Sequence, residues 1–167
     1  MIMMGHARSG QVPRLRLVDA EVSAEPPASG VPFFVLDSGF SMCGACGTTL
    51  TGEARAGARH YVCDASRGGC GAVRVAAGPF ETHVACQALA MLAMPCVLER
   101  AGELGVADLA QVTPGALASW WESASFPDRQ AMIGTLLDRV CVTPAPGQED
   151  GLIDQDCLAF VWTSPLP

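Results

Sequence analysis

Residues 40–77 read FSMCGACGTTLTGEARAGARHYVCDASRGGCGAVRVAA, and the four cysteines of this stretch organise the segments around them. Cys43 and Cys46 have the spacing C-x-x-C, and a glycine follows them. Cys63 and Cys70 are separated by six residues, and a glycine follows them too. Zinc prefers four ligands at the corners of a tetrahedron, and two loops that face each other across a hairpin supply them. We therefore predict that Cys43, Cys46, Cys63 and Cys70 bind one structural zinc ion in a small β-ribbon over residues 40–77.

Two other readings of these cysteines stay open from the residues alone. The thiols could be buried or reactive without a metal, and C-x-x-C also occurs as a redox pair in thioredoxin-like proteins. A redox pair needs a βαβ context, which the surrounding sequence does not predict. His60 could replace a cysteine as a ligand, although its neighbour Tyr61 indicates an ordinary strand. Because four cysteine ligands leave no open coordination position, a metal held here would be structural and not catalytic.

The remaining cysteines, Cys86, Cys96, Cys141 and Cys157, lack paired spacing. Each lies where a small apolar side chain would fit, and free cysteine is often buried. We expect these four to be packing residues. We also expect a cytoplasmic protein, in which disulfides are rare.

The ribbon itself is predicted to contain short strands separated by glycine turns. We expect strands at residues 48–51, 60–62 and 72–75, with residues 52–58 as the connection of the first hairpin. Residues 31–40 are apolar, and we expect them to pack as a short helix or strand beside the metal site.

Helical periodicity follows the ribbon. Gly78-Pro79 begins a helix that runs to about Met94, with Glu81 in its first turn, where a carboxylate suits the helix dipole. Pro95 ends or kinks this helix. Its predicted apolar face consists of Phe80, Val84, Ala88, Met91 and Leu92.

Three further helices are predicted before the chain returns to strands. They cover residues 97–104, residues 113–123 and a segment that Ser125 caps together with Asp128. The buried stripe of the last helix is predicted to be Met132, Ile133, Leu136, Leu137 and Val140, after which Val140 and Val142 alternate as a strand and residues 157–162 form its partner.

These elements define an α+β protein: a small zinc β-ribbon followed by helices and a short C-terminal β-hairpin. We divide the chain into a loosely ordered lead at residues 1–39, the ribbon at 40–77 and a helical segment with C-terminal strands at 78–167. The last two parts are expected to pack together as one unit.

The charge is acidic and unevenly distributed. The chain has no lysine, and its net charge is −7. Residues 43–86 carry four arginines and three acids, whereas residues 87–167 carry three arginines and ten acids. Nucleic-acid binders are usually basic, because phosphate contacts supply most of their affinity. The cysteine-rich segment is therefore the only part whose charge does not oppose a nucleic-acid partner.

The sequence predicts no catalytic centre, no small-molecule substrate and no membrane anchor. Ser9 has no Asp/His partner near it, and neither a phosphate-binding glycine loop nor a His-Glu-x-x-His motif is present. Apolar runs stay shorter than the roughly 18 residues that span a bilayer. Trp120 and Trp121 could form an interaction surface, although on an amphipathic helix at least one of the two is expected in the core.

From Phe40 to Trp162 the order of these motifs resembles the recombinase zinc β-ribbon of large serine recombinases, such as phage serine integrases. The similar features are the C-x-x-C-G opening at residues 43–47, the Tyr-x-Cys at 61–63 and the helix that follows. The segment WWESASFPDRQAMIGTLLDRVCV at residues 120–142 and the final strand at 158–162 resemble the C-terminal part of that domain. Only 42 residues precede Cys43, and no heptads occupy residues 97–111, so we expect neither the family's catalytic domain nor its coiled coil.

The resemblance implies zinc ligation by the same four cysteines and a role in gripping DNA during recombination or integration. The candidates to contact phosphates or bases are then Arg55, Arg59, Arg67 and Arg74. The alternative interpretation is that these arginines are ordinary solvent-exposed surface residues. The implied partners are an attachment-type DNA site and a recombinase subunit acting in trans.

Two non-DNA alternatives remain beside this interpretation. One is a zinc-stabilised module for protein–protein interaction, in which the acidic half meets a basic partner. The other is a decayed recombinase remnant with no retained role.

Overall fold

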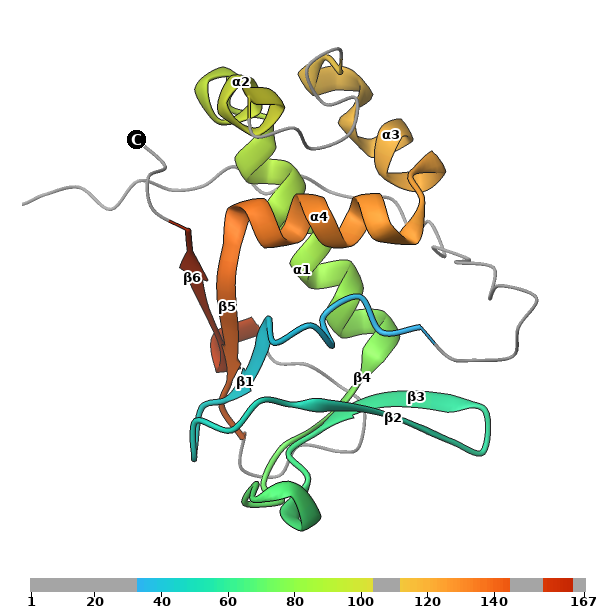
Figure 1. The fold of residues 1–167 in the computed structure, drawn as a ribbon, viewed down its shortest axis with the longest axis vertical. Coiled ribbons are helices and arrows are strands. Elements are labelled where there is room, and N and C mark those ends of the chain that lie inside the picture. Colours follow the sequence, from blue (N-terminus) through green and yellow to red (C-terminus); the bar gives the residue numbers. More distant parts are fainter. Residues whose placement is uncertain (1–32, 104–111, 145–154, 164–167) are drawn as a thin grey trace, which may run out of the picture.

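The computed structural model of the chain describes residues 33–103, 112–144 and 155–163. Within these residues the chain forms four helices and two three-stranded sheets, which confirms the predicted α+β class. In Figure 1 the helices stack above the ribbon sheet, and the C-terminal sheet lies along one side. The strands are β1 (Ser41–Cys43), β2 (Thr51–Arg55), β3 (Ala58–Val62), β4 (Arg74–Ala76), β5 (Leu137–Val142) and β6 (Leu158–Trp162), and the helices are α1 (Ala77–Leu92), α2 (Pro95–Glu103), α3 (Leu117–Ser123) and α4 (Phe126–Leu136).

The ribbon sheet has the strand order β2-β3-β4, and all of its pairs are antiparallel. The predicted limits of its first hairpin were wrong, because β2 begins at residue 51 and most of residues 52–58 is strand. Only Ala56 and Gly57 form the turn, with φ of 50° and 81°. Two positive φ values define a type I′ turn, whose twist matches that of the flanking strands. β4 was predicted one to two residues too early.

The C-terminal sheet has the order β1-β5-β6. β5 pairs with β6 in antiparallel fashion, which confirms the predicted C-terminal hairpin. β1 was not predicted. It pairs in parallel with β5, so that Ser41 lies opposite Val140 and Cys43 lies opposite Val142. The first cysteine of the ribbon therefore belongs to the sheet formed by the end of the chain.

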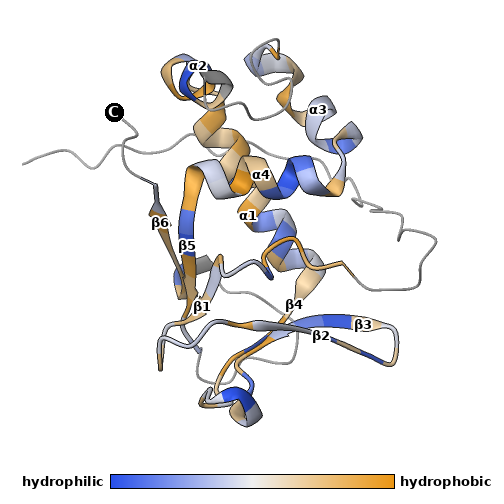
Figure 2. Ribbon diagram, viewed as in Figure 1, coloured by the Kyte–Doolittle hydropathy of each residue, from blue (hydrophilic) through white to orange (hydrophobic). Residues whose placement is uncertain are grey.

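Helix α1 passes through the centre of the molecule and is close to its predicted limits (Figure 1). Phe80, Val84, Ala88 and Leu92 are buried as predicted, whereas Met91 is half-buried. Figure 2 shows apolar residues over the upper part of α1 and at the ends of β5, and polar residues on parts of α4 and β3.

Two details of α1 differ from or refine the prediction. Glu81 does not lie in the first turn, because the helix already begins at Ala77, and its carboxylate contacts Arg59 and Tyr61 instead. Pro95 ends the helix as expected, and α2 leaves at 103° to α1. Of the helices in the described part of the chain, none is by itself long and apolar enough to cross a membrane, and α1 with α2 meets that test only as this bent pair.

Helix α4 begins at the predicted cap, where Ser125 Oγ accepts a hydrogen bond from Asp128 N. Its predicted C-terminal limit was wrong. Met132, Ile133 and Leu136 are buried helical residues, but Leu137 and Val140 belong to β5. The chain passes from helix to strand without a connecting loop, because pairing with β6 begins at Leu137 itself, and pairing with β1 follows from Val140.

The buried residues form one hydrophobic cluster that joins the ribbon, the helices and the C-terminal sheet. Phe34, Tyr61 and Phe80 form a chain of edge-to-face aromatic contacts within it, with centroids 5.3 and 5.4 Å apart. Phe34 and Leu36 fall in the segment predicted as a loose lead, so the ordered core begins before residue 40. Residues 35–40 form turns, and none of residues 33–40 is in the helix or strand that we expected for residues 31–40. Residues 1–32 lie outside the described part.

Candidate metal centre

The four cysteines predicted as ligands lie together at the base of the ribbon. Their sulfur atoms are all within 4.8 Å of one another. Cys43 Sγ lies 3.6 Å from Cys70 Sγ, and Cys46 Sγ lies 3.5 Å from Cys63 Sγ. Zn–S bonds of about 2.3 Å in a tetrahedron separate the sulfurs by roughly 3.8 Å. A disulfide would bring two sulfurs to about 2 Å. The spacing therefore fits one tetrahedral metal ion and no disulfide.

The two loops hold these sulfurs with different local structures. The first loop is a tight turn in which Gly47 N donates to Cys43 O and Cys43 N donates to Thr48 O, both at 2.8 Å. The second loop contains a short 3-10 turn at Ala65–Arg67, capped by the Asp64 carboxylate, which accepts from Ser66 N. This turn accommodates the six residues between the second pair of cysteines, so the wide spacing still brings Cys63 and Cys70 together with the first pair.

Backbone N–H groups point at the sulfurs. Cys70 N lies 3.2 Å from Cys63 Sγ and donates to it. Gly69 allows this approach, because a Cβ at that position would lie 2.6 Å from Cys63 Sγ. Such donors stabilise the thiolate charge that a metal site requires.

The four thiols differ in exposure and acidity. Cys43 and Cys63 are buried, whereas Cys46 and Cys70 are exposed. Burial raises the pKa of the Cys43 thiol to about 12 and also raises the pKa of Cys63. The Thr48 hydroxyl and N–H lower the pKa of Cys46 to about 6. Desolvation keeps buried thiols protonated unless a cation compensates, so a metal bound here would have to displace the protons of Cys43 and Cys63.

One residue of this site was missed by the sequence analysis. Thr48 Oγ1 lies 3.4 Å from Cys46 Sγ and donates to Gly68 O at 3.5 Å, so a single hydroxyl connects the two loops. Its position two residues after the C-x-x-C pair carried no signal, because threonine there also fits a plain strand. Thr48 orients the ligands without being one.

Within the described part of the chain, His60, His83 and the remaining cysteines are not part of this cluster. His60 is not among the grouped ligands. His83 packs against Phe160 with ring centroids 5.9 Å apart, and burial lowers its pKa. Cys86, Cys141 and Cys157 are half-buried, whereas Cys96 is exposed, which corrects its prediction as a packing residue.

The candidate DNA-contacting arginines fall into two groups. Arg59 lies on the face of β3 that carries Tyr61, and it donates to Glu81 at 2.9 Å. Arg55 and Arg74 lie on the opposite face, because neighbouring residues of a strand alternate. Arg67 extends from the second loop with 69% of its side chain exposed.

Two of the outward arginines have acidic partners. Arg74 contacts Glu53 at 3.1 Å, and Arg67 contacts Asp64 at 3.7 Å. Arg55 is exposed at the end of β2 and makes no ion pair within the described part of the chain. These residues, apart from Arg55, line a shallow concavity of about 480 Å³ beside the metal site.

Comparison of the chain with protein family models, curated proteins and solved structures finds no match in any of the three. What the geometry establishes is a group of four cysteines that could hold one metal ion.

Proposed function

We propose that this chain is a non-catalytic zinc-ribbon module that binds DNA and takes part in recombination or integration, as a fragment or modulator of a serine recombinase. The observation that carries the proposal is the convergence of four sulfurs at the base of a hairpin that lies along the lower edge of the molecule (Figure 1). A rigid, metal-anchored hairpin is a suitable element to contact a nucleic acid, and the resemblance to recombinase ribbons gives the kind of partner.

The proposed metal is zinc in a structural role. Four thiolates are soft ligands that suit zinc, and they occupy all four tetrahedral positions. No position is left for water or substrate, so the ion would stabilise the fold and would not activate a reactant. The ligands would be Cys43, Cys46, Cys63 and Cys70.

The zinc assignment is tested with purified, reduced protein and elemental analysis. We expect one zinc per chain, and Co²⁺ in its place should give the visible absorption of a tetrahedral thiolate site. Cys43→Ser should lose the metal, whereas Cys96→Ser, an exposed cysteine outside the cluster, should keep it. Protein without zinc, or equal metal content in both variants, would rule out the site.

The proposed DNA surface is the face of the ribbon that points away from α1, which we call the outer face, together with the second cysteine loop. Arg55 and Arg74 share that face, and Arg67 lies beside it. We assign Arg59 a structural role and do not count it among the DNA contacts, because it faces α1 and forms an ion pair with Glu81. The ion pairs of Arg67 and Arg74 are exposed and therefore weak, so a phosphate can replace their carboxylate partners.

The charge distribution sets an expectation for the strength of this binding. Few phosphate contacts are available, and the net charge of −7 opposes the approach of DNA. We therefore expect modest affinity that weakens steeply with salt. Each phosphate contact contributes about one unit to the slope of log K against log salt concentration.

DNA binding is tested by fluorescence anisotropy of zinc-loaded protein with an attachment-type duplex at low salt. The double variant Arg55→Ala/Arg67→Ala should bind roughly tenfold more weakly and lower the salt slope by about two. Arg139→Ala is the matched control, since this exposed arginine lies in the other sheet and pairs with Asp138. Absence of binding by the unmodified protein at low salt would end the DNA proposal.

One observation favours a second candidate, a zinc-stabilised protein-interaction module. Two of the three outward arginines, Arg67 and Arg74, already contact acids, so the outer face mixes both signs of charge. A mixed surface suits a protein partner better than a polyanion. Capture of a partner that survives nuclease treatment, together with failure of the anisotropy experiment, would favour this candidate over DNA binding.

A further inference from the structure

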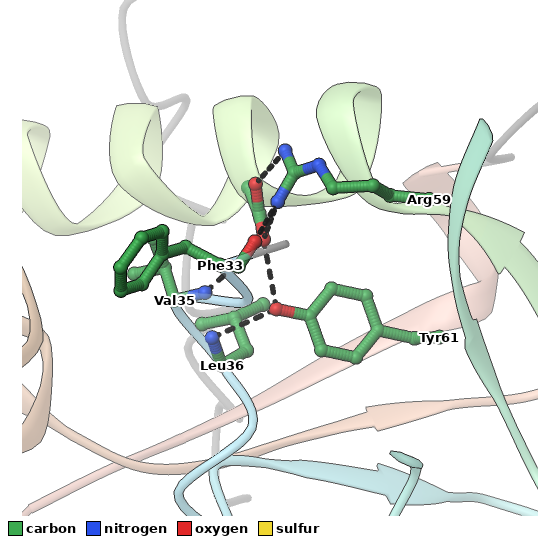
Figure 3. Close-up of polar contacts among 6 residues, drawn as sticks. Phe33, Val35, Leu36, Arg59 and Tyr61 are labelled. Atoms are coloured by element: carbon green, nitrogen blue, oxygen red, sulfur yellow. Dashed lines mark hydrogen bonds and ion pairs between the residues drawn. The ribbon is translucent and has the colours of Figure 1, made fainter. Parts of the chain in front are cut away.

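Residues 33–37, which we name the strap, lie between α4 and the β2–β3 hairpin (Figure 1). The strap forms turns, and the hydrogen bonds of its backbone go mainly to side chains. Val35 N donates to Glu81 Oε1 at 3.1 Å, and Leu36 N donates to the Tyr61 hydroxyl at 2.8 Å. The close-up in Figure 3 shows how these groups converge from the strap, β3 and α1.

The side chains of the strap are also inserted into the ribbon. Phe34 is 8% exposed and packs edge-to-face on Tyr61, and the Arg59 guanidinium lies over its ring at 5.4 Å. Gly52 of β2 lies directly against the ring, because a Cβ there would be 2.4 Å from Phe34 Cγ. Leu36 has no exposed surface.

Two further polar contacts tie the strap to the same hairpin. Arg59 Nη1 donates to Phe33 O, and Gly52 N donates to Asp37 Oδ1 at 3.2 Å. The strap is therefore held largely by Gly52, Arg59 and Tyr61, with Glu81 and Gln130 as its helical partners.

The strands that hold the strap are also the strands that end at the metal site. β3 carries Arg59 and Tyr61 and ends at Val62, which directly precedes Cys63 of the candidate metal site. β2 begins opposite the same end, since Thr51 pairs with Val62. A metal at the four sulfurs would fix the base of this hairpin, and with it the positions of Arg59 and Tyr61 over α1.

We propose that metal binding at the four cysteines and docking of the strap are energetically coupled, so that loss of the metal releases residues 33–37 from the hairpin. The inference rests on the metal part of the proposed function and is independent of DNA. Coupling of two sites is reciprocal, so a weakened strap must weaken metal binding even though no strap residue touches a sulfur.

The reciprocal effect is tested by zinc competition with a chromophoric chelator. Phe34→Ala should weaken zinc binding by about tenfold, which is a typical coupling between two sites. Phe34→Leu should weaken it less and serves as the milder variant if the alanine variant folds poorly. Leu92→Ala is the matched control, because it truncates a fully buried side chain at the far end of α1. Unchanged zinc affinity in both Phe34 variants, or an equal loss in Leu92→Ala, would overturn the coupling.

The direct effect is tested on the unmodified chain by hydrogen exchange before and after chelation of zinc. The amides of Val35 and Leu36 should exchange faster without the metal, while the amides of α4 keep their protection. Strap amides that stay protected, or α4 amides that accelerate equally, would contradict the proposal. Elemental analysis beforehand separates this result from failure of the metal site, and the anisotropy experiment separates it from failure of DNA binding.

Discussion

Tyr61 is the only tyrosine of the chain, and its hydroxyl lies between Leu36 N and the carboxylate of Glu81. Burial, followed by the charge of Glu81, raises the pKa of Tyr61 far above its usual range. The folded protein therefore favours the neutral phenol. The contribution of the buried neutral phenol to the stability of the fold is complete below the unfolded pKa of about 10. This contribution is lost progressively as the pH rises above that value.

Alkaline titration followed by tyrosinate absorbance tests this expectation. At about pH 11 an unfolded tyrosine is ionised, but the folded chain should show no tyrosinate signal. The signal should appear only together with loss of the circular dichroism spectrum, and Tyr61→Phe should remove it. Ionisation near pH 10 with an intact fold would show that the hydroxyl is not buried.

Glu81 accepts hydrogen bonds from Val35, Tyr61 and Arg59 with a side chain that is 14% exposed. In Glu81→Gln an amide N–H₂ would face the Arg59 guanidinium, so one charge loses its partner. We expect the free energy of unfolding to fall by about 2 kcal/mol in urea denaturation. Glu122→Gln, the same change at an exposed position, should shift it by less than about 0.5 kcal/mol. Equal effects would show that the network is not stabilising.

At the residue scale, the sequence predicted the four cysteines but not their surroundings. The spacing of cysteines carries the chemistry directly, because few other patterns bring four sulfurs together. Glu81 was expected to serve the helix dipole, since its partners Arg59 and Val35 are distant in sequence. Arg59 can be placed on the inner face of the ribbon only when the limits of β3 are known, because successive residues of a strand alternate between its two faces.

Among the elements, the β2–β3 turn is locally strained. Ala56 has a φ of 50°, a left-handed conformation that costs a residue with a Cβ about 1 kcal/mol or more. Ala56→Asn would create the Asn-Gly pair that type I′ turns prefer. We expect a gain of roughly 0.5–1 kcal/mol in thermal or urea unfolding. Ala72→Asn, at an exposed position outside the left-handed region, should bring no gain.

Strand β6 offers a matched pair of substitutions. Phe160 lies opposite the buried Val140 and packs on His83, whereas Val161 lies opposite Arg139 and is 37% exposed. Phe160→Asp should cost about 2 kcal/mol or more, because it places a charge against the core. Val161→Asp should change the free energy of unfolding by about 0.5 kcal/mol or less. A reversed order in urea denaturation would mean that the register of β6 is wrong.

Element boundaries were predicted well where a chemical signal marks them. Ser125 and Pro95 fixed the helix limits near them, because a cap and a missing N–H act locally. The sequence of β2, Thr-Gly-Glu-Ala-Arg, has little strand propensity, and its pairing with β3 determines its structure. Leu137 and Val140 are three residues apart, which fits a helical period, whereas both are buried in β5 around the register shift between Leu137 and Arg139. The helical pattern therefore hid the start of the strand.

At the scale of the whole molecule, the ribbon is not a separate unit. β1 belongs to the C-terminal sheet, and Tyr61 shares its core with Phe34 and Phe80. A peptide of residues 40–77 would lack these partners, although it keeps all four cysteines. β1 was not predicted because it pairs in parallel with β5, which is distant in the sequence. A local pattern of apolar residues carries no information about such a pairing.

We expect this peptide to bind zinc at least about tenfold more weakly than the full chain, since metal binding must then order the ribbon without its partners. Co²⁺ titration against a competing chelator measures the difference, and circular dichroism reports whether strands form. Equal affinity of peptide and chain would show that the metal centre is self-sufficient.

The parallel pairing of Cys43 with Val142 has a consequence for biosynthesis. The ribosome releases the N-terminal part of a chain first, so all four thiols emerge long before the strand that anchors the first of them. During that interval the nascent cysteines are open to oxidation and to competing ions. If the four cysteines hold an ion as proposed, its secure loading would be a late event, completed only when translation has passed the end of β5.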